Sequence, residues 1–82
     1  LDIRTNNIIR ARFTTSGQLE ILNTGNSVFI GEGAGANDDL SNRNNVSIGY
    51  NALNSNVIGI GNVALGAASL TNNIANGNTA VG

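Results

Sequence analysis

The amino-acid sequence predicts an all-β protein in which a short β-meander precedes a parallel β-roll, or β-solenoid, of 16–18-residue coils. Two observations support this fold class. Residues 1–22 alternate apolar and polar side chains with a period of two, which is typical of strands. After residue 25, a phrase resembling Asn-Val-small-aliphatic-Gly occurs four times, and its closing glycines lie 18, 17 and 16 residues apart. Self-similarity at a nearly fixed period indicates a repeat architecture.

Residues 1–24 are predicted to form the meander and its transition, and residues 25–82 the repetitive β-roll segment. The three alternating runs of the meander are separated by Asn6–Asn7 and by Thr15–Gly17. Asn tolerates the positive φ of a tight hairpin turn, and a loop that ends in Gly suits a three-residue connection. The acids and arginines of the meander are expected to form solvated cross-strand pairs, each worth about 0.2–1 kcal/mol.

Each repeated phrase is predicted to be a short strand whose outer two positions point one way and whose middle position points the other way. The outer set is aliphatic except at Thr79, so we expect it to fill a core shared between copies of the chain. The middle set is mixed and is expected to face a less demanding environment. The predicted shared-core residues are Val28, Ile30, Val46, Ile48, Val63, Leu65, Thr79 and Val81.

A glycine closes every phrase, and two physical reasons for it are open. The backbone bends there with positive φ, or it must approach a neighbouring backbone closely. Both reasons hold if several chains meet at a common axis. The predicted turn or close-approach glycines are Gly31, Gly49, Gly66 and Gly82.

A second register follows each glycine, with aliphatic pairs at 57–58 and 74–75, and predicts a second short strand in every coil. Asn recurs at the expected corners, where it adopts left-handed backbone angles and where its amides can form ladders between stacked coils. The first coil carries the segment 33–39, Gly-Ala-Gly-Ala-Asn-Asp-Asp, in place of the later Leu-containing segments. We therefore expect the first coil to be an irregular transition from the meander.

Composition favours an assembling structural protein. A chain of 82 residues with a small-residue core, no Cys and no His lacks the usual reinforcements of a small domain, so oligomerisation is expected. The formal net charge of −1 argues against a nucleic-acid partner. No charged side chain follows Arg43, and the regular aliphatic phrases indicate packing against further copies rather than disorder.

Little in the sequence suggests catalysis, and no enzyme activity, catalytic residue, cofactor or metal ligand is predicted. Without His or Cys, nucleophilic and soft-metal sites have no side chains to use. Glu32, Asp38 and Asp39 are the only clustered acids; a polar loop is the favoured interpretation and a Ca²⁺ site the alternative. Phe29 and Tyr50 are expected to pack over coil corners, with ligand stacking as the alternative.

The phrases Asn45–Gly49 and Asn62–Gly66 resemble the head repeat of trimeric autotransporter adhesins, a parallel β-roll of three chains. The longer unit from Gly49 to Gly66 and the lead-in Ile3–Gly17 are similar to phage tail-fibre-like proteins. The resemblance implies an extracellular homotrimeric fibre segment, on a virion tail or a bacterial surface, with no nucleic-acid partner and no membrane insertion. Its implied function is to extend and present a receptor-binding tip for host attachment. The alternative is an adhesive head that binds a host receptor or glycan directly.

Overall fold

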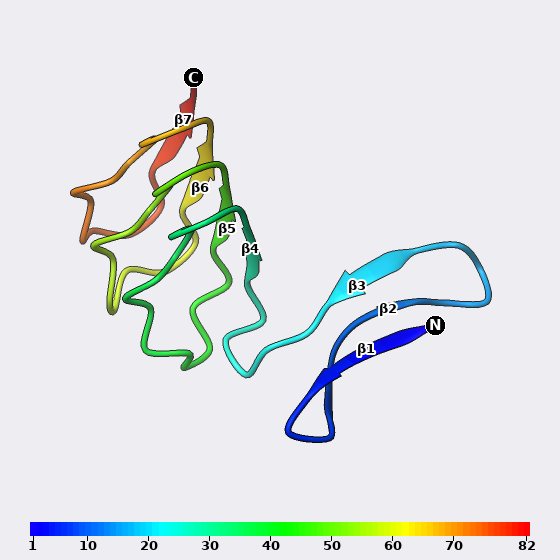
Figure 1. Cartoon of the computed structure of the whole chain (residues 1–82). Helices are drawn as coiled ribbons and strands as arrows, with labels where there is room; N and C mark the ends of the chain where they lie inside the picture. Colours follow the sequence, from blue (N-terminus) through cyan, green and yellow to red (C-terminus); the bar gives the residue numbers. More distant parts are fainter.

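A computed structural model describes residues 1–82 and shows an all-β chain with seven strands and no helix. The strands form two separate sheets, one of three strands and one of four (Figure 1). The strands are β1 (Asp2–Thr5), β2 (Ile8–Phe13), β3 (Leu19–Ile21), β4 (Val28–Ile30), β5 (Val46–Ile48), β6 (Val63–Leu65) and β7 (Thr79–Val81).

The first sheet is the predicted meander, with β1, β2 and β3 paired antiparallel in chain order. Asn6 and Asn7 have φ of 50° and 61°, which fits a two-residue hairpin turn whose backbone twist matches that of the flanking strands. Arg12 lies opposite Glu20 and donates a hydrogen bond to its carboxylate, as the expected cross-strand pair. In Figure 1 this sheet lies apart from the other, and it has no second layer over either face.

The second sheet is parallel, with β4, β5, β6 and β7 adjacent in sequence order. The four phrases pair in register, so that Val28, Val46, Val63 and Thr79 stand in one row. Equivalent residues therefore lie side by side in successive strands. The spacing of the closing glycines is the length of one strand plus the connection that follows it, and we call such a strand with its connection a coil.

The connections between the parallel strands follow one another around the same path (Figure 1). Backbone hydrogen bonds join them level by level, for example Gly35 N to Ala52 O and Leu53 N to Ser69 O, both at 2.9 Å. The prediction of a second strand in each coil is wrong, because residues 57–58 and 74–75 are not in strands. Nearby Asn amides donate to backbone carbonyls at Gly59 and Ala75, and such local bonds compete with a strand ladder.

The expectation of an irregular first coil does not hold over residues 33–35, and among positive-φ positions the first connection differs from the later ones only at Leu40, with φ of 59°. Gly33 and Gly35 have φ of 74° and 60°, and the later connections repeat this alternation of positive φ. The equivalent pairs are Asn51 with Leu53 and Ala68 with Leu70, with φ between 50° and 58°. An L-residue in this conformation costs roughly 1–2 kcal/mol. The first coil thus adopts this backbone path with glycines, whereas the later coils adopt it with L-residues whose positive φ is strained.

The buried apolar interior of residues 25–82 is small, as the composition predicts. Ala52, Leu53 and Ala64 form the buried cluster, with Leu70 packed against it. The expectation that the middle strand position faces a less demanding environment is wrong, because Ser47 and Ala64 are fully buried. The pleat sends these middle side chains into the coil.

Each of the first three coils places one large side chain in its interior, but from different positions. In the first coil Phe29 comes from the strand, and a Cβ placed on Gly35 would overlap its ring. In the next coil Ser47 is small and Leu53 is fully buried, and in the third Ala64 is small and Leu70 packs against the buried cluster. Where the middle strand residue is large, the connection has Gly; where the middle strand residue is small, the connection has Leu at the equivalent position.

A column of buried polar side chains runs beside the strands. Ser27 Oγ accepts from Asn45 N at 2.9 Å, Asn45 Oδ1 from Asn62 N at 2.8 Å, and Asn62 Oδ1 from Asn78 N at 2.9 Å. Asn62 Nδ2 also donates to Ala75 O at 2.8 Å. Asn side chains therefore link successive levels at these positions, but through bonds from backbone N–H groups instead of the expected amide-to-amide ladder.

Candidate functional site: the strand face

The outer side chains of the parallel strands form one apolar surface, which we call the strand face. It is defined as Val28, Ile30, Val46, Ile48, Val63, Leu65, Thr79 and Val81, the residues predicted to form a shared core. Because the middle side chains fill the coil, these outer side chains point away from it. Ile30 is 44% exposed, Leu65 42% and Val81 74%. In a single chain the strand face is therefore an outer surface.

In-register parallel pairing gives the strand face two straight rows. Val46 stands between Val28 and Val63, and Ile48 stands between Ile30 and Leu65. Four of the rows' members are half-buried by their neighbours in the row, and the rest remain exposed. The surface carries no charged side chain, and the hydroxyl of Thr79 is its one polar side-chain group.

The closing glycines border the strand face; both proposed reasons for glycine apply to Gly31, Gly49 and Gly66, and only positive φ applies to Gly82. Gly31, Gly49 and Gly66 have φ of 120°, 128° and 126°. A Cβ on Gly49 would lie 2.7 Å from the carbonyl group of Gly66, and one on Gly31 would lie 2.9 Å from that of Gly49. The close neighbour is thus the next coil of the same chain. Gly82 has φ of 107° and nothing within 4 Å of an added Cβ.

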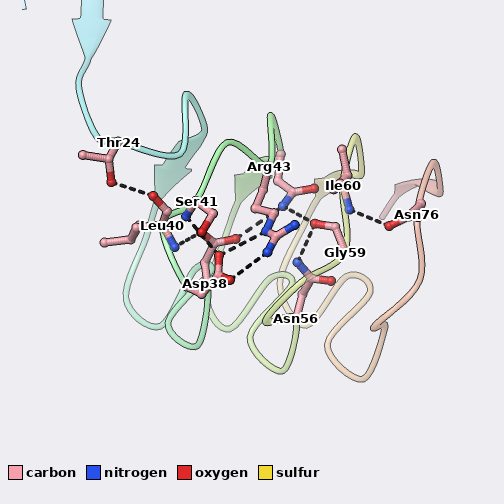
Figure 2. A network of polar contacts seen from close by, with 11 residues as sticks. Thr24, Asp38, Leu40, Ser41, Arg43, Asn56, Gly59, Ile60 and Asn76 are labelled. Atoms are coloured by element: carbon pink, nitrogen blue, oxygen red, sulfur yellow. Dashed lines mark hydrogen bonds and ion pairs between the residues drawn. The ribbon is translucent and has the colours of Figure 1, made fainter.

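The acids of the first coil bind within the coil instead of forming an open cluster. Asp38 accepts a hydrogen bond from Leu40 N at 2.8 Å, and Asp39 accepts one from Ser41 N at 3.0 Å (Figure 2). The structure brings no three carboxylate, His or Cys side chains together, so Glu32 does not join the other two acids. The carboxylates stabilise the turn that leads into β5.

Arg43 and Asp39 form an ion pair at 2.8 Å beside this turn. The hydrogen bond from Arg43, followed by the bond from Ser41 N, lowers the pKa of Asp39 well below its usual range. The same pair raises the pKa of Arg43. No charged residue follows this pair in the chain, so the later coils carry no electrostatic site.

The two aromatic side chains of the repeat differ in position. Phe29 is half-buried with its ring against Gly35, so it packs within the first coil. Tyr50 is 57% exposed and stands beyond the strand face, in the turn after β5. No pocket is present on the chain. Tyr50 is thus the one exposed aromatic of the repetitive segment.

Sequence reasoning missed a second group of exposed aliphatic side chains, because it placed them in strands or did not consider them. Leu40, Ile58 and Ile74 lie in the three connections and are 45%, 61% and 68% exposed. Their spacing of 18 and 16 residues, close to that of the closing glycines, was the available signal.

No protein-family model, curated protein or solved structure matches this chain. None of its segments is a helix long and apolar enough to cross a membrane.

Proposed function

We propose that the chain is a structural segment of a homotrimeric fibre, in which three copies lie in parallel and cover one another's strand faces. Each copy contributes a β-roll of stacked coils. The segment extends the fibre and presents a receptor-binding tip for host attachment, as in phage or injection-system tail fibres, outside the cell. The proposal makes this segment a mechanical spacer with no catalytic role.

The observation that carries the proposal is the straight, uncharged strand face, which is exposed in the single chain. Full burial of one aliphatic side chain contributes about 1.5–3 kcal/mol. Several side chains of this face are about half exposed, so a covering copy recovers a substantial part of that amount at each level. The buried apolar cluster of one chain, by contrast, contains only three fully buried residues.

Parallel copies fit this surface because its rows repeat at every level. A second copy that lies in the same direction can therefore cover aliphatic side chains of this surface at each level. Uncharged surfaces of this kind have no like-charge repulsion between identical chains. Identical chains around a closed axis are also the usual form of soluble assemblies.

Substitution Ile48→Asn tests the proposal. Ile48 lies in the middle of one row, and an amide there is left unpaired when the face is covered. We expect the wild-type chain to have the mass of a trimer by light scattering and Ile48→Asn to be monomeric. The matched control is Ile8→Asn, which changes an equally apolar side chain, 52% exposed, in the other sheet. A stable Ile48→Asn trimer contradicts the role of the strand face.

The alternative function, direct binding of a receptor or glycan, rests on the exposed Tyr50. An aromatic ring with a hydroxyl group is suited to contact sugars and proteins. The test is binding of the purified chain and of Tyr50→Ala to a glycan array and to host cells. Binding by the wild-type chain that Tyr50→Ala loses supports the adhesive alternative over a passive spacer.

A further inference from the structure

A second apolar surface lies on the connections between the parallel strands, away from the strand face. We call it the connection stripe and define it as Leu40, Ile58 and Ile74, one residue from each connection. Their exposed fractions of 45%, 61% and 68% equal or exceed those of Ile30 and Leu65 in the strand face. A chain with so small an interior thus leaves two aliphatic surfaces in water.

Contacts between successive connections place the stripe residues on adjacent levels. Asp39 N donates to Val57 O at 3.2 Å, next to Leu40 and Ile58. A Cβ on Gly59 would lie 2.5 Å from Ala75 O, so the residues that follow Ile58 and Ile74 in the chain lie against each other. Figure 2 shows two further links between levels in this region, from Thr24 to Leu40 O at 2.6 Å and from Ile60 N to Asn76 at 2.8 Å.

The chemistry of the stripe fits another copy of this chain better than a charged partner. The only ion pair near it, Arg43 with Asp39, is already satisfied, and no charge follows in the chain. The stripe needs an uncharged aliphatic surface with a matching repeat. The strand face has both properties, since the two surfaces are built from the same levels of the same stack.

Symmetry supplies the second argument. In a closed ring of three identical chains each chain touches its neighbours through two different surfaces, because such a contact is heterologous. One strand face alone provides only the first of these surfaces. We propose that the connection stripe of one copy packs against the strand face of the next copy, closing the trimer. This inference rests on the proposed trimeric fibre and names the contact that closes it.

The first test compares Ile58→Ser/Ile74→Ser with the control Ile8→Ser by sedimentation of the full chain over a dilution series. Each truncated side chain weakens its own contact about tenfold, and a closed trimer contains every contact three times, so the trimer dissociation constant of the double variant rises about 10⁶-fold. Because the midpoint concentration varies as the square root of that constant, the double variant dissociates at roughly thousandfold higher concentration. Ile8→Ser dissociates at the wild-type concentration. A double variant that dissociates like the control overturns the inference and leaves the trimer intact. A wild-type chain that is monomeric overturns the proposed function as well.

The second test uses the absence of Cys from the chain. Ile48→Cys and Ile58→Cys chains are produced separately and together, then oxidised and examined without reductant. If the stripe of one copy meets the strand face of the next, covalent dimers that contain one chain of each kind form in the mixture. A mixture without such dimers, from trimers of normal mass, overturns the contact while the fibre proposal stands.

Discussion

Exchanging the large interior residue between two positions of the first coil tests how the coils are filled. Phe29 supplies the bulk of this coil from the strand, while Gly35 leaves room for its ring. The second and third coils do the reverse, with Leu53 and Leu70 in the connection. The double variant Phe29→Ala/Gly35→Leu should therefore reproduce the third coil, which has Ala64 in the strand and Leu70 in the connection.

Each single variant is expected to destabilise the chain. Phe29→Ala leaves a cavity; burial of Phe29 is partial, so the loss is about 2 kcal/mol, below the 3–5 kcal/mol of a fully buried Phe. Gly35→Leu forces a side chain into the ring and adds a positive-φ penalty, together about 3 kcal/mol. Additive effects would total about 5 kcal/mol, whereas we expect a loss of about 2 kcal/mol in the double variant.

The assay is urea unfolding followed by circular dichroism, with all variants at one protein concentration because the proposed trimer would make the free energy of unfolding depend on concentration. Gly77→Leu is the control for backbone strain, since Gly77 has φ of 67° and open space around an added Cβ. A double variant that loses the sum of the two single losses would show that the two positions do not share one interior space.

Three further predictions concern the stack. Gly49→Ala should lower the free energy of unfolding by at least about 3 kcal/mol, because its Cβ meets the Gly66 backbone at 2.7 Å. Gly61→Ala, with φ of 69° and no contact, should lower it by only about 1 kcal/mol. Equal losses in thermal unfolding would contradict the close approach. Asn62→Ala should cost about 1–3 kcal/mol, because it removes the partners of two partly buried hydrogen bonds, to Ala75 O and from Asn78 N, while exposed Asn72→Ala should be neutral in the same urea assay. Folding lowers the pKa of Asp39, so its ion pair stabilises the chain fully above about pH 4 and progressively less as the pH falls below that value. Between pH 7 and pH 3 the melting temperature of Asp39→Asn should therefore fall less than that of the wild-type chain. Equal decreases in melting temperature would refute the role of the pair.

Local patterns in the sequence predict the strands and turns well where one cause dominates. The Asn6–Asn7 turn follows from the backbone freedom of Asn, and the four phrases are strands because their alternation has one consistent direction. The sequence also predicts which side chains lie together on the strand face, because side chains two residues apart in a strand point to the same side.

Other features depend on contacts between coils, which no single segment shows. Residues 57–58 read as strand by composition, but the amide bonds of Asn56 and its neighbours turn the chain there. Leu53 and Leu70 adopt positive φ against their own preference because each fills a coil interior. The equivalence of Gly35 with these leucines therefore appears only once the coils are stacked.

The molecular mass and the unfolding midpoint of the purified chain, both measured over a wide dilution series, test the central claim most directly. If one copy is too thin to be stable alone, the mass is three times that of one chain at high concentration, and the midpoint falls as the chain is diluted. A compact monomer whose cooperative unfolding is the same at every concentration would contradict the account.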